Sequence, residues 1–351
     1  MGLKIQKKFW KNKKVLITGH TGFIGSWLFF YFDNILTAQT FGISLKPKKK
    51  SLYNKLRIKN SRNSYIADIK NFKKIDQLIK KIKPEIIIHL AAQPLVLESV
   101  KKPIETFNTN VNGTLNLLRI IRKYKFIKNV IFFTSDKVYR TGYEKYFNEN
   151  SPLGGNDPYS ASKAASEIVI NSYSKIYLIK KNITVLRAGN IIGGGDYNKN
   201  RLFYDISNSI LKNKTLVVRN KNHSRPWQHI IDVIQTIRIL LEKLHKKKGV
   251  FQQFNIGPSI RNNLSIKKII EKYLSNFDLK IKYLNNPTIE TENLNIDTSK
   301  IYKTHNIKNN LNLKNSIKFT LDWYIKFGKN KAKAEEICKN QIIEYENKKS
   351  K

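Results

Sequence analysis

The first half of the chain alternates short runs of apolar and β-branched residues with longer amphipathic stretches. Strands are expected at Val15–Thr18, Gln39–Ser44, Tyr65–Ala67, Glu85–Leu90, Val130–Thr134 and Thr184–Ala188. Helices are expected at 24–32, 108–123 and 160–179, where apolar residues recur with helical spacing. The EIIIHL run at 85–90 is typical of a strand that is buried on both faces. The alternation predicts an α/β protein with a parallel sheet and helices on both of its faces.

Beyond about residue 190 the pattern becomes irregular and rich in Gly and Asn. Short strands such as Leu216–Val218 and Phe254–Ile256 and a helix at 264–274 are expected there. We therefore divide the chain into a first domain at 1–188 and a smaller mixed α/β lobe at 189–330, interleaved with the sheet of the first domain. The Lys/Glu-rich end at 331–351 is expected to be a surface helix or a tail.

Charge and cysteine content limit the classes of partner. The 66 Lys and Arg residues exceed the 25 Asp and Glu residues, which gives a formal net charge of +41. Such a charge suggests nucleic acid or an anionic membrane as partner, but the lysines are scattered and form no single patch, so we expect neither. The single cysteine, Cys338, excludes a disulfide framework and a cysteine-based zinc site, and no metal motif is visible. We see no apolar leader before Lys14 and expect a cytoplasmic protein.

A glycine-rich segment, Gly19–Gly25, follows the first strand and precedes the first helix. Its glycines permit close approach of the backbone to a pyrophosphate, and the helix N-terminus offers unpaired N–H groups to the phosphates. This context predicts a dinucleotide site on a Rossmann-type fold. The second strand ends in Ser44-Leu45-Lys46, without the acid that NAD-selective sites place there. NAD is the expected cofactor, but NADP stays possible, with Lys46 near a 2′-phosphate.

Two further segments carry candidate chemistry. Tyr159 and Lys163 lie four residues apart and share one face of a predicted helix. A nearby ammonium favours the phenolate and should lower the pKa of the phenol, so the pair can accept a proton from a sugar hydroxyl. Thr134–Lys137 follows a buried strand, where ligands of open α/β sheets bind. There Asp136 would act as an acid and Lys137 as a base. The alternatives are an accidental pair on a helix and an ordinary solvated turn.

Together these segments resemble the extended short-chain dehydrogenase/reductase family of NAD-dependent epimerases and dehydratases. The likeness rests on TGHTGFIG at 18–25, LAAQ at 90–93, NTNVNGT at 108–114 and YSASK at 159–163, and it extends to about residue 330. Within the family, TSDKVY at 134–139, RAGNIIGGGD at 187–196 and RPWQH at 225–229 are most similar to the 4,6-dehydratases of CDP-linked glucose. The related enzymes for dTDP-glucose carry Asp-Glu in place of Asp136-Lys137.

The resemblance implies oxidation of a hexose at C4, loss of water across C5 and C6, and return of the hydride to C6. It makes Tyr159, assisted by Lys163 and Ser135, the base at the C4 hydroxyl, Lys137 the base at C5 and Asp136 the acid at C6. The implied cofactor contacts are Gly19, Thr21, Gly22, Phe23, Ile24, Gly25, Asp68, Ile69, Leu90, Ala91, Ala92, Asn110, Thr134, Tyr159 and Lys163, and the implied substrate contacts are Gln93, Asn190, Arg201 and Arg225.

Several alternatives remain open from the sequence. Arg201 and Arg225 could pair with acids such as Asp205 or Asp232 instead of phosphates. Leu97-Glu98 stand where the family usually has basic residues, which puts the nucleotide base in question. Another nucleotide-sugar dehydratase or a 4-epimerase fits most motifs, and only the charge favours a non-catalytic dinucleotide- or RNA-binding protein. The family usually dimerises through the helices at 108–123 and 160–179, so we expect a homodimer, whose product enters a bacterial surface polysaccharide such as O-antigen.

Overall fold

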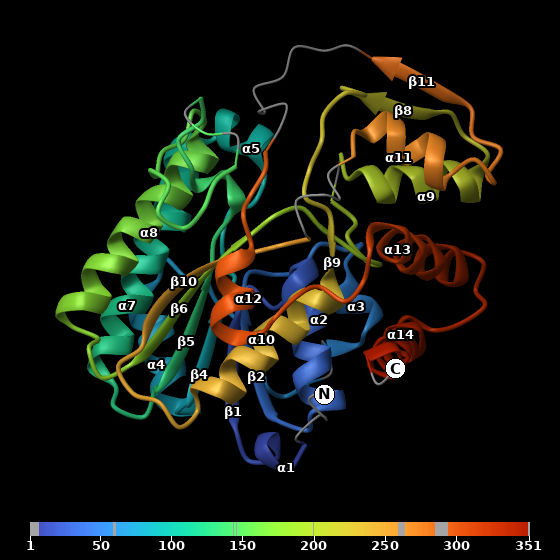
Figure 1. Ribbon diagram of the computed structural model, residues 1–351. Coiled ribbons are helices and arrows are strands. Elements are labelled where there is room, and N and C mark those ends of the chain that lie inside the picture. Colours follow the sequence, from blue (N-terminus) through green and yellow to red (C-terminus); the bar gives the residue numbers. More distant parts are fainter. Residues whose placement is uncertain are drawn as a thin grey trace.

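The computed structural model describes residues 7–58, 61–142, 144, 146–198, 200–258, 264–284 and 294–349. Its centre is a parallel sheet of seven strands in the order β10-β6-β5-β4-β1-β2-β3 (Figure 1). The strands are β1 Lys14–Thr18, β2 Gln39–Ser44, β3 Ser64–Ile66, β4 Ile86–His89, β5 Asn129–Phe133, β6 Asn182–Ala188 and β10 Phe251–Ile256. The chain builds outward from β1 to β3 and then returns to build β4 to β10. The strand order therefore reverses between β1 and β4, where α/β sheets bind ligands.

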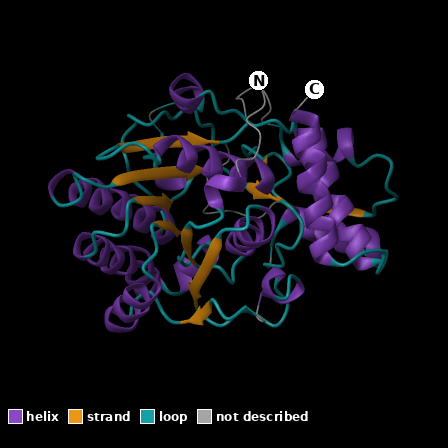
Figure 2. Ribbon diagram, turned by 90° about the horizontal axis from the view of Figure 1, so that it is seen from below, coloured by secondary structure: helices purple, strands orange, loops and turns teal. Residues whose placement is uncertain are grey.

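Helices cover both faces of this sheet (Figures 1 and 2). Ile87 in β4 packs on the side of α4 Phe72–Ile82, α7 Gly113–Lys123 and α8 Pro158–Ile176. Its neighbours Ile86 and Ile88 pack on the opposite side, with α2 Phe23–Phe30 and α10 Ile230–Leu244. Because successive residues of a strand point to opposite faces, both faces must be apolar. This confirms the expected architecture. The remaining short helices of the first half are α1 Lys7–Trp10, α3 Leu52–Lys55, α5 Val96–Lys101 and α6 Pro103–Phe107.

Three expected helices differ from the prediction in their bounds. The helix at 24–32 begins at Phe23 and continues as a π-helix over Tyr31–Ile35, and α7 is preceded by a π-helix over Asn108–Asn112. Helix α8 begins two residues before Ser160 because Asp157 caps it. The Asp157 carboxylate accepts from the N–H groups of Tyr159 and Ser160 at 2.9 and 3.0 Å, and a proline suits the first turn.

The second half of the chain forms a smaller lobe. It contains β7 Ile191–Ile192 paired with β9 Gln228–His229, β8 Leu216–Arg219 paired with β11 Ile281–Leu284, and the helices α9 Leu202–Lys212, α11 Ile266–Tyr273, α12 Ser299–His305 and α13 Leu313–Gly328. The ring of Trp227 lies edge-on to Phe203 at 5.3 Å within the core of this lobe. Strand β10 comes from the same half yet lies beside β6 in the main sheet. The domain boundary at residue 188 stays a prediction.

The C-terminal segment differs from the surface helix or tail that we expected. Helix α14, Ala334–Lys349, buries Ile337, Cys338, Ile342 and Tyr345 in the main core. The Trp323 indole donates to the Cys338 sulfur at 3.3 Å, and the Tyr345 hydroxyl donates to the Asp232 carboxylate at 2.8 Å. The buried residues follow a helical spacing that the high Lys and Glu content of the segment obscured. Residues 350 and 351 lie outside the described part.

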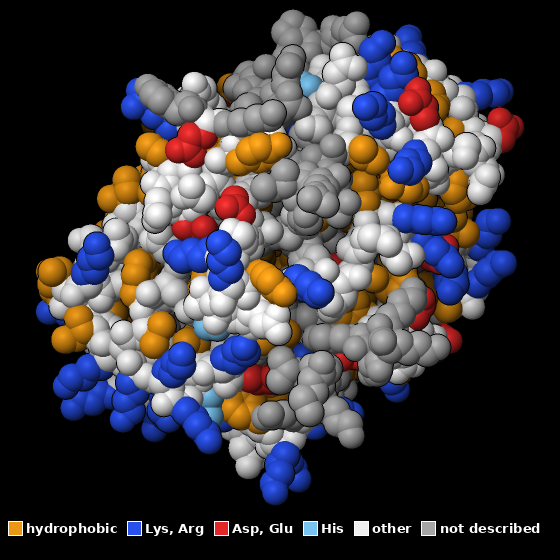
Figure 3. Space-filling view, in the orientation of Figure 1, with side chains coloured by type: hydrophobic (Ala, Val, Ile, Leu, Met, Phe, Trp, Pro, Cys, Tyr) orange, Lys and Arg blue, Asp and Glu red, His pale blue; other side chains and the backbone are white. Residues whose placement is uncertain are grey.

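Lysine and arginine side chains are seen on both sides of the face in Figure 3 and along its lower edge. In the described part of the chain, every helix is too short or too polar to cross a membrane.

Candidate functional site

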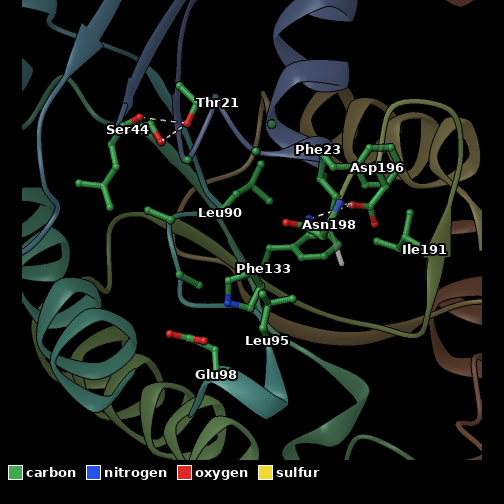
Figure 4. Close-up of a pocket in the computed structure, with 18 of the residues that line it drawn as sticks. Thr21, Phe23, Ser44, Leu90, Leu95, Glu98, Phe133, Ile191, Asp196 and Asn198 are labelled. Carbon is green, nitrogen blue, oxygen red and sulfur yellow. Dashed lines mark hydrogen bonds between the residues drawn. The ribbon is translucent and has the colours of Figure 1, made fainter. Parts of the chain in front are cut away.

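A cavity of about 760 Å³ lies at the carboxyl ends of β1, β2, β4 and β5 (Figure 4). The glycine-rich loop and the loop after β2 form one side of it. Residues that follow β4 and β5 form the other side, together with the start of α8 and the segment 188–201 from the second half of the chain. The cavity therefore combines the strand-order reversal with the smaller lobe, as expected for a ligand site in this architecture.

The glycine-rich loop fits tightly under the cavity. Gly19 has a φ of +78°, and a Cβ there would lie 2.8 Å from the backbone nitrogen of Ala91. A Cβ on Gly25 would lie 2.3 Å from the Gly19 carbonyl oxygen. Gly22 precedes α2 without a side-chain cap, so the first turn of the helix presents its N–H groups at the cavity. This arrangement suits a diphosphate. All the loop residues that we predicted as cofactor contacts line the cavity: Gly19, Thr21, Gly22, Phe23, Ile24 and Gly25.

The other predicted cofactor contacts divide into two groups. Asp68, Ile69, Leu90, Ala91, Ala92 and Thr134 line the cavity. Asp68 also caps its own turn, because its carboxylate accepts from the N–H of Lys70 at 2.9 Å. Asn110 is buried outside the cavity lining. Its amide donates to the Ser162 hydroxyl at 2.8 Å, and its oxygen accepts from the N–H of Gln93 at 2.8 Å. Asn110 therefore fastens the segment after β4 to α8.

The five predicted catalytic residues meet at one end of the cavity. Ser135, Asp136 and Lys137 follow β5, and Tyr159 and Lys163 lie on the first turns of α8. The Ser135 hydroxyl donates to the Asp136 carboxylate at 3.0 Å and is hydrogen-bonded to the Tyr159 phenol. The Lys163 ammonium donates to the carbonyl oxygen of Phe133 at 3.1 Å. Two segments 20 residues or more apart in sequence thus form one site.

Burial sets the protonation behaviour of this site. It raises the pKa of Asp136 to about 6, although the charges of Lys137 and Arg225 oppose the shift. It raises the pKa of Tyr159 to about 12, against the Ser135 hydrogen bond and the charge of Arg201, and it lowers the pKa of Lys163 to about 8. We expected the pKa of Tyr159 to fall. The prediction was wrong for this state because desolvation of the phenol outweighs the neighbouring charges.

A buried ion pair between Glu167 and Arg187 lies next to the catalytic segments. The Glu167 carboxylate accepts from the Arg187 guanidinium at 2.6 and 2.8 Å and from the Thr134 hydroxyl at 2.5 Å. The side chains of Glu167 and Arg187 are 0% and 2% exposed. Glu167 lies one helical turn beyond Lys163, so the pair connects α8 to the ends of β5 and β6. No sequence motif indicates this pair, because its two residues lie 20 positions apart on different elements.

Two of the four predicted substrate contacts line the cavity. Asn190 and Arg201 line the cavity, and Arg201 forms an ion pair with Asp196 at 3.0 Å. Asp196 also lines the cavity, and sequence reasoning proposed Asp205 as the alternative partner instead. Arg225 is buried outside the lining and donates to the Ser224 carbonyl oxygen at 2.8 Å.

Gln93 also lies outside the cavity lining. Its side-chain amide donates to the Leu95 carbonyl oxygen and to the Thr106 hydroxyl, both at 3.0 Å. Glu98, in contrast, does line the cavity, with its carboxylate 3.4 Å from the ammonium of Lys102. In the described part of the chain no cluster of three or more His, Cys, Asp or Glu side chains is arranged to hold a metal ion.

Comparison with known proteins now assigns the family. Residues 16–335 match the family model described as GDP-mannose 4,6 dehydratase. The chain belongs to this dehydratase family. A relative, the CDP-glucose 4,6-dehydratase of Salmonella typhimurium, is 37% identical over 281 residues, which cover 77% of this chain and 78% of the relative.

Solved structures agree with this assignment. The dTDP-glucose 4,6-dehydratase of Bacillus anthracis, solved in complex with NAD, has a TM-score of 0.74 and 25% identity, over 90% of this chain and 97% of that chain. A UDP-glucose 4-epimerase of Thermotoga maritima shares the fold, with a TM-score of 0.76 and 21% identity over 90% of this chain and 99% of that chain. The dehydratase family and the epimerases thus use one architecture, and the side chains in the cavity must distinguish them.

Proposed function

We propose that this chain is a CDP-glucose 4,6-dehydratase that uses NAD as a recycled cofactor. The observation that carries the proposal is the presence of Asp136 and Lys137 in the same cavity as Tyr159 and Lys163. A 4-epimerase needs a base for the C4 hydroxyl only, whereas loss of water also needs an acid and a second base. NAD, when bound, accepts the hydride from C4 and returns it to C6, and the product is CDP-4-dehydro-6-deoxyglucose.

The roles follow from the positions of the side chains. The base at the C4 hydroxyl is the phenolate form of Tyr159, assisted by the Ser135 hydroxyl to which Tyr159 is hydrogen-bonded. Lys163, four residues further along α8, supplies positive charge at this end of the cavity. Lys137 takes the C5 proton, which the 4-ketone has made acidic, and gives a proton back to C5 when the hydride returns to C6. Asp136 gives its proton to the departing C6 hydroxyl, and its pKa near 6 keeps a protonated fraction available at neutral pH.

The residues of the cofactor half fit NAD. The first turn of α2 and the glycine-rich loop would hold the diphosphate, and the segment Leu90–Ala92 would lie against the nicotinamide half. Asn190 and Arg201 would face the diphosphate of the sugar nucleotide, with Arg201 exchanging its partner Asp196 for phosphate oxygens. Gln93 and Arg225 support this region without lining it.

The first experiment follows the C5 hydrogen. Wild-type protein with NAD and CDP-glucose in deuterated buffer is expected to yield a 4-keto-6-deoxy sugar that carries deuterium at C5. Lys137→Ala is expected to retain NAD binding and to lose C5 exchange by a factor of about 100 or more, the scale of a general base. Lys101→Ala, which removes another lysine of the cavity lining, is the matched control and should exchange normally. Retained exchange in Lys137→Ala would refute the role of Lys137.

A second experiment tests the substrate. CDP-glucose, dTDP-glucose, UDP-glucose and GDP-mannose are compared at equal concentrations, and CDP-glucose is expected to have the highest kcat/KM. Equal turnover of UDP-glucose or GDP-mannose would contradict the CDP assignment but leave the dehydratase chemistry standing. Formation of a C4 epimer without loss of water would favour the 4-epimerase alternative.

We also infer a homodimer. Exposed apolar side chains mark the outer face of α8 and the adjoining α6, with Ile168 60%, Ile176 67% and Ile104 77% exposed. An apolar surface of this kind is typical of a protein interface. Sedimentation at micromolar concentration is expected to give a dimer, which Ile168→Glu combined with Ile176→Glu should dissociate.

The buried free thiol of Cys338 supports a cytoplasmic location. A product of this kind would serve the synthesis of a surface polysaccharide such as O-antigen.

A further inference from the structure

His89, the last residue of β4, is a buried histidine for which the proposed chemistry has no use. It is 5% exposed and lies outside the cavity lining. Its Nδ1 atom is 2.7 Å from the hydroxyl of Thr18 in β1, and its Nε2 atom is 3.2 Å from the hydroxyl of Thr114 in α7. Burial lowers the pKa of His89 to about 3, and the charge of Lys163 adds to this shift. The imidazole is therefore neutral and joins the central sheet to α7.

The hydrogen bonds of Thr114 determine the tautomer of this imidazole. The Thr114 hydroxyl donates its proton to the carbonyl oxygen of Asn110 at 2.6 Å. The oxygen of Thr114 can therefore only accept from His89, which places the proton of the neutral ring on Nε2. The Nδ1 atom is then an acceptor, and the Thr18 hydroxyl donates to it. His89 thus transmits a hydrogen bond from β1 to the helical segment that carries Asn110.

One end of this chain of hydrogen bonds holds a wall of the cavity. The Thr18 oxygen accepts from the backbone N–H groups of Leu90 and Ala91 at 3.2 and 3.3 Å. Both residues line the cavity, in the segment that the proposed function sets against the nicotinamide half of NAD (Figure 4). Because the Thr18 hydroxyl points its proton at His89, its lone pairs stay directed at these two N–H groups.

The other end reaches the helix that carries the catalytic tyrosine. The side-chain amide of Asn110 donates to the Ser162 hydroxyl at 2.8 Å, and the Ser162 hydroxyl donates to the carbonyl oxygen of Tyr159 at 2.8 Å. Asn110 and Ser162 are 2% and 0% exposed. Every side chain along this path donates in the same direction, from Thr18 toward Tyr159. Buried chains of this kind strengthen one another and resist displacement.

We propose that His89 is a positioning residue that fixes the nicotinamide side of the cavity relative to Tyr159. Oxidation at C4 requires the nicotinamide and the Tyr159 phenol to face the same carbon atom, and a small misplacement of either slows the reaction steeply. His89 touches neither group and acts through Thr18 at one end and Asn110 at the other. The inference rests on the proposed function only for the identity of the substrate, because the network joins this wall of the cavity to α8 with any sugar.

Steady-state kinetics with NAD and CDP-glucose give the first test. His89→Leu removes both hydrogen bonds and should lower kcat about 10-fold or more, with KM within about 3-fold of wild type, because the substrate contacts are untouched. His89→Gln keeps one acceptor and one donor and should recover most of the lost kcat. His305→Leu is the matched control. It removes another buried imidazole, hydrogen-bonded to Gln252 at 3.0 Å outside the cavity lining, and should leave kcat unchanged.

Amide hydrogen exchange gives a second test that needs no sugar. The full chain is loaded with NAD, and exchange is followed by mass spectrometry. His89→Leu should speed exchange both in the segment 90–93 and in the first turns of α8, although these lie about 70 residues apart in sequence. Thr114→Val breaks the same path one link further along while it keeps the shape of the side chain, and it should have the same two effects. Thr114→Val carries both tests if His89→Leu does not fold.

The results distinguish a positioning role from a general loss of stability. An unchanged kcat in Thr114→Val, an equal loss in His305→Leu, or no recovery in His89→Gln would overturn the proposal. Faster exchange confined to the segment 90–93 would do the same, because the path would then not reach α8. Absence of CDP-glucose turnover by the wild type would refute the dehydratase assignment, and the exchange measurement would still decide the role of His89.

Discussion

Replacement of Asp136 by Asn should stabilise the protein while it removes activity. Asp136 is 2% exposed, and in the described part of the chain its Oδ2 atom has no hydrogen-bond partner. Burial raises its pKa from 3.8 to about 6. The difference between these two pKa values corresponds to about 3 kcal/mol.

The sign follows from proton binding. Between about pH 4 and pH 6 the folded protein keeps a proton on Asp136 that the unfolded chain has lost. Stability therefore falls as the pH rises through this window and stays lower by about 3 kcal/mol above it. Asn carries no charge, so Asp136→Asn should gain up to about 3 kcal/mol in the free energy of unfolding at pH 7.5 and almost nothing at pH 4.

Urea unfolding, followed by circular dichroism at both pH values, measures this gain. Asp68→Asn is the control, because the side chain of Asp68 is 36% exposed in the same cavity, and it should not stabilise the protein at pH 7.5. A gain in Asp136→Asn that does not depend on pH, or a loss of stability at pH 7.5, would refute the reasoning. The variant should also lose elimination of water while it retains C4 oxidation, a trade of stability against function.

Three further predictions concern the pH profile, the cofactor loop and the buried ion pair. Burial lowers the pKa of Lys163 to about 8, so kcat should fall as the pH rises above 8, and an unchanged alkaline limb in Lys163→Arg would contradict this assignment. Gly25→Ala, whose Cβ would lie 2.3 Å from a carbonyl oxygen of the loop, should weaken NAD binding at least 10-fold in a fluorescence titration, whereas Gly257→Ala should not. Glu167→Gln leaves the Arg187 charge buried and should cost about 3–5 kcal/mol of unfolding free energy; a loss below about 1 kcal/mol in urea would argue against it.

The sequence predicted those parts of the fold that depend on local pattern. Buried parallel strands are apolar throughout, so β2 and β4 could be located from Gln39–Ser44 and Glu85–Leu90 to within one residue at each end. The glycine-rich loop could be located equally well, because close backbone contacts and phosphate binding both favour glycine at nearby positions. All residues from 19 to 25 except His20 line the cavity.

Contacts between distant or irregular segments were not predictable in the same way. The partner of Arg201 is Asp196, in a stretch without periodic pattern, and not Asp205, which was named as one possible partner. The rise in the pKa of Tyr159 depends on how deeply the phenol is buried, which a motif does not encode. Apolar and polar residues are barely separated around helix α14, so its sequence carries no clear sign that one of its faces is buried.

The burial of α14 has a consequence for how the protein is made. Tyr345 and Cys338 close the main core against side chains from α10 and α13, so the hydrophobic centre beneath the cofactor sheet stays incomplete until residue 345 has emerged from the ribosome. Until α14 has been synthesised, part of the apolar surface of this core stays uncovered. We therefore expect nascent chains that lack α14 to expose apolar surface, the condition under which chaperones bind.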